Sequence, residues 1–148
     1  MTDIAWQLEH SVEAAVSASF AWKFWTNVTN WDDPPAQFVL DGPFVAGSTG
    51  TTLLPGQDPL RWRIRDVLCG RSATIEMQLD RATLSFTWLF DEVADRRTNL
   101  TQHIVLSGKN APAYIQQVQE GLGSNLRDGM KKVAEAMARA ETAAPRVD

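Results

Sequence analysis

The chain of 148 residues has one cysteine, Cys69, two histidines and one tyrosine, and it contains no long apolar run. A single cysteine excludes an internal disulfide and is typical of a reducing compartment. No apolar stretch reaches the ~20 residues that a membrane-spanning helix requires. The opening residues, MTDIAWQLEH, lack the basic and apolar regions of a secretory signal. We therefore expect a soluble, cytoplasmic protein.

Motifs for metal binding and for nucleophilic catalysis are also missing. The histidines, His10 and His103, are not arranged as His-x-x-x-His, and there is no Cys-x-x-Cys pair. There is no Gly-x-Ser-x-Gly elbow and no phosphate-binding glycine loop. Cys69 ends a predicted strand beside Gly70, which favours a structural cysteine over a nucleophile paired with histidine. We predict no metal site and no cofactor.

Charge and length limit the partners and the domain count. The net charge is −4, with acidic and basic residues interspersed, which argues against nucleic acid or an anionic membrane as a partner. The length suits one domain, which we assign to residues 1–141. Residues 142–148 show no periodicity and are predicted to be a disordered tail. Monomer and homodimer both remain open.

The strongest pattern is an amphipathic helix predicted from Pro112 to about Ala140. Its apolar residues recur every three or four positions along one stripe: Ile115, Val118, Leu122, Leu126, Met130, Val133 and Met137. A helix of about seven turns needs a large apolar partner, and only an upstream sheet offers one. Gly121, Gly123 and Gly129 interrupt it, each costing about 1 kcal/mol relative to alanine. They indicate a close backbone approach, a bend or room for a ligand.

Alternation of apolar and polar residues predicts the sheet. The predicted strands are 4–13, 37–40, 47–54, 60–65, 73–79, 84–90 and 100–106. Ser17 is the predicted N-cap of a short helix, and a second helical turn is expected within 27–35. Short turns join the last six strands, which predicts an antiparallel meander.

Three arginines alternate with buried positions on one predicted strand. Arg61, Arg63 and Arg65 would face Glu76 and Gln78 on the next strand. Strict alternation favours a solvated outer face with cross-strand ion pairs over an anion-binding patch.

At this point the chain resembles the START-like helix-grip superfamily, in particular its bacterial polyketide cyclase/dehydrase branch. The resemblance covers residues 4–140. It rests on the first strand running into Ala15-Val16-Ser17 and on three segments: FAWKFWTNVTNW, GPFVAGSTGTTLLPG and TNLTQHIVLSG. It implies an α+β fold in which a curved seven-stranded antiparallel sheet surrounds a long C-terminal helix, with two short helices between strands 1 and 2. In that superfamily the space between sheet and helix commonly holds a lipid, polyketide, hormone or other apolar molecule.

His10 is the most informative polar residue. Its place in the alternation points it inward, and the resemblance puts the first strand beside the last, which brings inward-facing Gln102 close to it. An imidazole and a carboxamide in an apolar cavity can orient a carbonyl or hydroxyl, and a histidine can also transfer a proton. The alternative is a buried histidine that only hydrogen-bonds Gln102 or the backbone. His10 is thus a weak catalytic candidate, whereas His103 is expected on the solvated face.

We predict that the protein binds a small hydrophobic, lipid-, polyketide- or aromatic-like molecule between the sheet and the C-terminal helix. Trp25 and Trp31 are assigned to core filling. The predicted ligand-binding residues are His10, Trp62, Ile64, Met77, Phe86, Trp88, Leu100, Gln102, Ile104, Leu122, Leu126 and Met130. A polyketide cyclase- or aromatase-like enzyme is an alternative, but it needs more convergent ionisable groups. A protein-interaction module is another, which an exposed apolar patch would favour.

Overall fold

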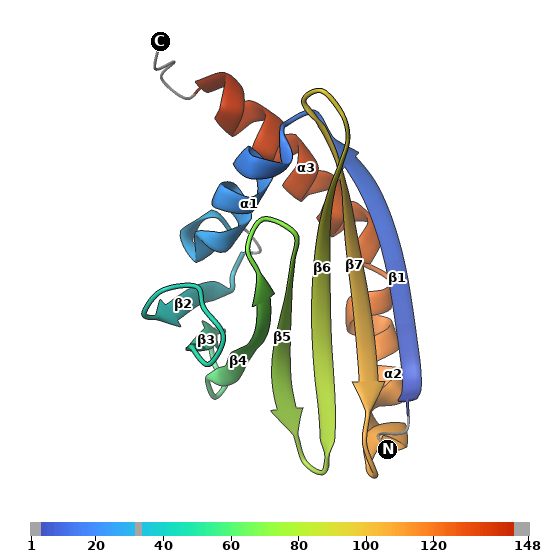
Figure 1. Cartoon of the computed structure of the whole chain (residues 1–148). Coiled ribbons are helices and arrows are strands. Elements are labelled where there is room, and N and C mark those ends of the chain that lie inside the picture. The colour runs from blue at the N-terminus through green and yellow to red at the C-terminus, as the bar shows by residue number, and fades with distance from the viewer. Residues whose placement is uncertain (1–3, 32–33, 144–148) are drawn as a thin grey trace.

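The protein is one curved antiparallel sheet with helices on its concave side (Figure 1). The computed structural model describes residues 4–31 and 34–143. The strands are β1 (Ile4–Ala14), β2 (Gln37–Asp41), β3 (Thr49–Leu53), β4 (Leu60–Leu68), β5 (Ser72–Leu79), β6 (Ala82–Ala94) and β7 (Arg97–Ser107). Their order in the sheet is β1-β7-β6-β5-β4-β3-β2, and every pairing is antiparallel. The predicted fold class and meander are confirmed, and β1 lies beside β7 as the resemblance implied.

Two short helical segments connect β1 to β2, as predicted. They are α1 (Ala18–Thr26) and the 3-10 turn η1 (Val28–Asn30). The side chain of Ser17 caps α1, because its Oγ accepts a hydrogen bond from the backbone N–H of Phe20 at 3.1 Å. Asn27 caps η1 in the same way, accepting from the N–H of Thr29 at 3.2 Å.

The C-terminal helix is interrupted, so the prediction of one continuous helix from Pro112 is wrong. A 3-10 turn, η2 (Ala111–Tyr114), leads into one α-turn, α2 (Ile115–Val118), and a π-turn, η3 (Gln119–Gly123), before α3 (Leu126–Ala143) begins. Gly121 and Gly123 weaken the helix there. The side chains of Ser124 and Asn125 donate to the carbonyls of Glu120 and Gly121, four residues earlier, and such bonds bend helices.

The predicted apolar stripe nevertheless faces the sheet. Val118, Leu126, Met130 and Met137 are buried, and the other stripe residues are half-buried: Ile115, Leu122 and Val133. The helix also runs past Ala140 to Ala143. Residues 142 and 143 of the predicted tail are therefore helical, while 144–148 lie outside the described residues.

A register shift in β1 sets its first residue apart from the rest of the strand. The pairing of β1 with β7 is irregular between Ile4 and Trp6, and a bulge of this kind turns a side chain to the other face. Ile4 is consequently 54% exposed. Trp6, Leu8 and His10 keep the predicted alternation and are half-buried.

On the convex face of the sheet, two of the three arginines predicted to form ion pairs do so among the described residues. Glu76 contacts Arg63 at 2.9 Å and Arg65 at 3.2 Å, and Arg65 also contacts Asp66 at 2.8 Å. The hydrogen bond to Asp66, aided by Glu76 and opposed by partial burial, raises the pKa of Arg65. Gln78 takes no part in these pairs, because its amide donates to the carbonyl of Ala82. Exposed pairs of this kind add little stability.

An aromatic cluster fills one end of the fold around Trp25, which is 4% exposed. Its ring centroid lies 5.2–6.1 Å from those of its neighbours Trp22, Trp31, Phe44, Trp88 and Phe90. The indole N–H of Trp31 donates to the carbonyl of Trp25 at 2.7 Å. Trp25 is therefore core, as predicted.

No helix within 4–31 or 34–143 is long and apolar enough to cross a membrane.

Candidate functional site

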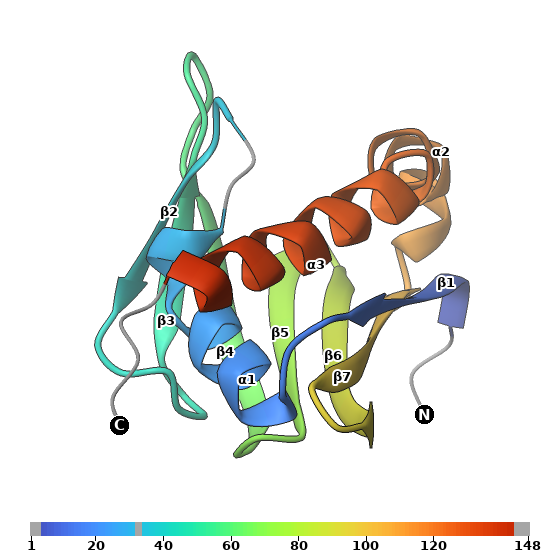
Figure 2. The same cartoon turned by 90° about the horizontal axis from the view of Figure 1, so that it is seen from above.

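The C-terminal helix covers the concave face unevenly. It packs chiefly on β1 and touches α1. Figure 2 shows α3 running along the concave side, with β1 on one side of it and β2, β3 and β4 on the other. The helix therefore covers the inner face of the central strands less than it covers β1. Side chains of the central strands still pack against neighbouring side chains of the same sheet.

Three predicted site residues keep accessible surface in the middle of the sheet. Met77 on β5, Phe86 on β6 and Gln102 on β7 point inward by their place in the alternation, yet each is only half-buried. Each strand is paired on both sides. Accessible surface at these positions therefore lies on the concave face of the sheet, not at a strand edge. His10 and Leu122 are half-buried as well.

The remaining predicted residues are packed inside the protein. Their exposed fractions are 8% or less, and they are Trp62, Ile64, Trp88, Leu100, Ile104, Leu126 and Met130. Trp62 is held in one orientation, because its indole N–H donates to Thr52 Oγ1 at 3.1 Å and its ring lies against Gly50. These residues belong to the closely packed core.

His10 and Gln102 lie directly opposite each other on β1 and β7, with Trp88 beside Gln102 on β6. Neither side chain forms a hydrogen bond with another described residue, and no buried side-chain nitrogen or oxygen in that part of the chain lacks a partner. The polar atoms of His10 and Gln102 therefore keep some solvent-accessible surface. His103 lies on the convex face, where its Nε2 is 2.9 Å from Gln7 Oε1.

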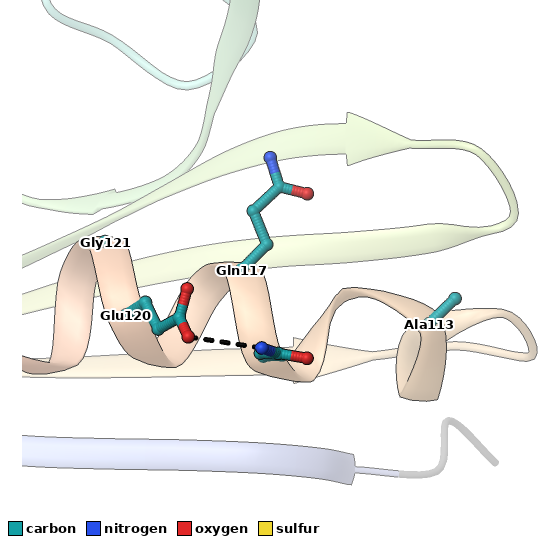
Figure 3. Close-up of a pocket in the computed structure, with 5 residues that line it drawn as sticks. Ala113, Gln117, Glu120 and Gly121 are labelled. Carbon is teal, nitrogen blue, oxygen red and sulfur yellow. Dashed lines mark hydrogen bonds between the residues drawn. The ribbon is translucent and has the colours of Figure 1, made fainter.

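Two hollows lie on the helical segment itself. One, of about 530 Å³, is open to solvent and is lined by Ala113, Gln116, Gln117, Glu120 and Gly121. In Figure 3, Gln117 extends away from the helix, while Gln116 donates to Glu120 Oε1 at 3.2 Å. The second, of about 360 Å³, is lined by Ala138, Arg139, Thr142 and Ala143. None of the predicted binding residues lines either hollow.

Comparison with known proteins identifies the fold. The sequence matches no protein-family model and no curated protein. A point mutant of norcoclaurine synthase from Thalictrum flavum superposes with a TM-score of 0.72 at 12% identity, over 95% of this chain and 98% of that one. The Zhui aromatase/cyclase from Streptomyces sp. R1128 gives 0.71 at 17% identity, over 96% and 99%. The chain therefore has the helix-grip fold. Protein Ms6760 from Mycobacterium smegmatis is also similar, with a TM-score of 0.63 at 18% identity over 97% of both chains.

Ionisable groups are sparse on the inner face of this helix-grip fold. His10 is the titratable residue among the predicted binding residues. Within residues 4–31 and 34–143 no three His, Cys, Asp or Glu side chains come together as a metal site. Cys69 is a free, exposed thiol in the turn between β4 and β5.

The sequence interpretation missed several contributors to the helix-grip interior. Thr52 and Gly50 hold the Trp62 indole, and half-buried Phe38 and Leu79 extend the inner face toward β2 and β5. Alternation places Phe38 and Leu79 on an inner face, which was the available signal. The contact of Gly50 with Trp62 depends on the β3–β4 register, which a single sequence does not reveal. The residues of the larger hollow lie on the polar side of the helix, where no apolar pattern marks them.

Proposed function

We propose that the protein binds a small hydrophobic molecule in the space between the concave face of the sheet and the C-terminal helical segment. One observation carries the proposal: Met77, Phe86 and Gln102 retain accessible surface although they point inward from central strands. A sealed core would bury such side chains completely. Apolar walls with a few polar groups are typical of small-molecule sites.

The proposed ligand contacts are the residues that sequence analysis selected. The half-buried members would touch the ligand directly: His10, Met77, Phe86, Gln102 and Leu122. The fully buried members would shape the site from behind. A fold neighbour supports the idea that this architecture accommodates small aromatic molecules, since norcoclaurine synthase from Thalictrum flavum has been solved with dopamine and hydroxybenzaldehyde.

The other two classes of function have less support. A cyclase or aromatase that works by proton transfer needs several convergent ionisable groups. Among the proposed ligand contacts, however, His10 is the one ionisable residue. A protein-interaction module would be favoured by one large apolar patch. The exposed large apolar side chains instead come from β1, β2, β3, β4, β6 and the β2–β3 loop: Ile4, Val39, Val45, Leu53, Leu60, Leu68, Leu89 and Val93.

Titration with the uncharged fluorescent probe N-phenyl-1-naphthylamine tests the proposal. We expect saturable binding at one site per chain, enhanced probe emission and quenching of tryptophan fluorescence. Met77→Trp should weaken probe binding by about tenfold, or about 1.4 kcal/mol of binding free energy, because the larger side chain occupies the space. Gln78→Trp is the matched control, since Gln78 is the next residue of β5 and faces outward.

Two results would count against binding in this space. In the first, the probe binds only under partly denaturing conditions, so that its emission reports exposed core. In the second, Met77→Trp and Gln78→Trp have equal effects. Native mass spectrometry of freshly purified protein would show independently whether an apolar molecule co-purifies.

A further inference from the structure

His10 and Gln102 share one cross-strand row of the inner face, whereas the polar side chains of Thr98 and Glu92 at the far end of that face are hydrogen-bonded to Val16 and Ala18. That row consists of His10 on β1, Gln102 on β7 and Trp88 on β6. The rows on either side of it are entirely apolar: Leu8–Ile104–Phe86 and Val12–Leu100–Phe90. A ligand that lies against Phe86 therefore has hydrogen-bonding groups at one point, next to the backbone of β7.

The same row contains no cation that would neutralise a ligand carboxylate. The charged strand residues within three positions of it, Glu9, Glu13 and Asp91, face outward and are exposed. Glu92 is on the inner face at the far end of β6. Its Oε1, however, already accepts a hydrogen bond from the N–H of Ala18 at 2.8 Å. Placing an unpaired carboxylate in such surroundings is costly, whereas a hydroxyl or carbonyl needs only a hydrogen-bond partner.

The two polar side chains offer both kinds of partner. Gln102 has an amide that donates and a carbonyl that accepts, and the neutral imidazole of His10 has one nitrogen of each kind. The indole of Trp88 packs against Trp25, with ring centroids 5.3 Å apart and 31° between the planes, so the side chain next to Gln102 is part of the packed core. A closely packed wall beside accessible polar atoms allows discrimination by hydrogen bonding.

We infer that His10 and Gln102 make the site selective for uncharged ligands that carry a hydroxyl or carbonyl oxygen, over bare hydrocarbons and over carboxylates. This rests on the proposed function, because it names the class of molecule that the same space accepts. The apolar body of the ligand lies against Phe86 and Met77, and its oxygen meets the His10–Gln102 pair.

Three ligands with one ring system test the selectivity: naphthalene, 2-naphthol and 2-naphthoate, each displacing N-phenyl-1-naphthylamine at mildly alkaline pH, where imidazole side chains are generally neutral. We expect 2-naphthol to bind about 2- to 10-fold more tightly than naphthalene, the effect of about one hydrogen bond. We expect 2-naphthoate to bind more weakly than 2-naphthol. His10→Leu and Gln102→Leu should each reduce the advantage of 2-naphthol, and His10→Gln should preserve part of it.

His103→Leu is the matched control, because His103 lies on the convex face and should leave all three affinities unchanged. Affinity for N-phenyl-1-naphthylamine and a thermal melt show whether each variant is folded. Equal binding of naphthalene and 2-naphthol, or equal effects of His10→Leu and His103→Leu, would overturn the inference while leaving the proposed function intact. Failure of the wild-type protein to bind N-phenyl-1-naphthylamine would overturn the proposed function, and the inference with it.

Discussion

The indole of Trp62 occupies the space that a side chain at residue 50 would need. The two residues face each other across β3 and β4, and a Cβ added to Gly50 would overlap the ring of Trp62. Thr52 fixes the ring from the same strand by accepting its N–H. A glycine in the middle of a strand, otherwise unfavourable, is explained here by the close approach of a large ring.

Gly50→Ala should therefore destabilise the protein. Overpacking of this kind costs about 1–3 kcal/mol, because the indole must move away from Thr52 or the strands must separate. Chemical denaturation of the variant and the wild type measures the loss. In a double-mutant cycle, the loss should be smaller in a Trp62→Phe background, since the smaller ring leaves room for the new methyl group. Additive effects of the two substitutions would contradict the proposed contact.

Gly129→Ala should have the opposite effect. Gly129 lies within α3, and a Cβ placed there has no heavy atom of another element within 4 Å. Alanine in a helix interior is favoured over glycine by about 1 kcal/mol, so the free energy of unfolding should rise by up to that amount. A higher melting temperature is the expected readout. A lower one would show that this flank of α3 packs against something.

Leu126 and Leu122 provide a matched pair on the C-terminal stripe. Leu126 is 8% exposed, whereas Leu122 is half-buried in the π-turn before it. Leu126→Ala should cost ~2–5 kcal/mol because it leaves a cavity among packed residues. Leu122→Ala should cost less, because part of its surface already faces open space. Thermal melts of both variants measure the order, and the reverse order would mean that the helical segment is seated differently on the sheet.

Removal of the cap at the start of α1 should weaken the protein moderately. Ser17→Ala eliminates the acceptor for the N–H of Phe20 and should cost about 0.5–2 kcal/mol. Ser19→Ala is the control, because Ser19 is exposed within the same helix and alanine has the higher helix propensity. Equal losses for the two variants would argue against capping by Ser17.

Much of the fold follows from local patterns in the sequence. Strand periodicity, turn residues and the spacing of the apolar stripe were sufficient to predict three features. These are the antiparallel meander, the buried face of the C-terminal helix and the inward direction of His10. These features depend on residues close together in the chain, and each has a characteristic period. The outer ion pairs of Glu76 followed for the same reason, since a hairpin turn sets the register of the strands it joins.

Other features were decided only by the tertiary structure. Periodicity did not reveal the π-turn at Gln119–Gly123, because it results from a balance between weak helix propensity and the hydrogen bonds of Ser124 and Asn125. The fit of Trp62 against Gly50 required the register of β3 and β4. The sequence also could not predict whether an inward-pointing side chain is fully buried or keeps accessible surface, because alternation indicates only the face of the sheet on which the side chain lies. The extent to which α3 covers β1 and leaves Met77, Phe86 and Gln102 accessible depends on how elements far apart in the chain pack together.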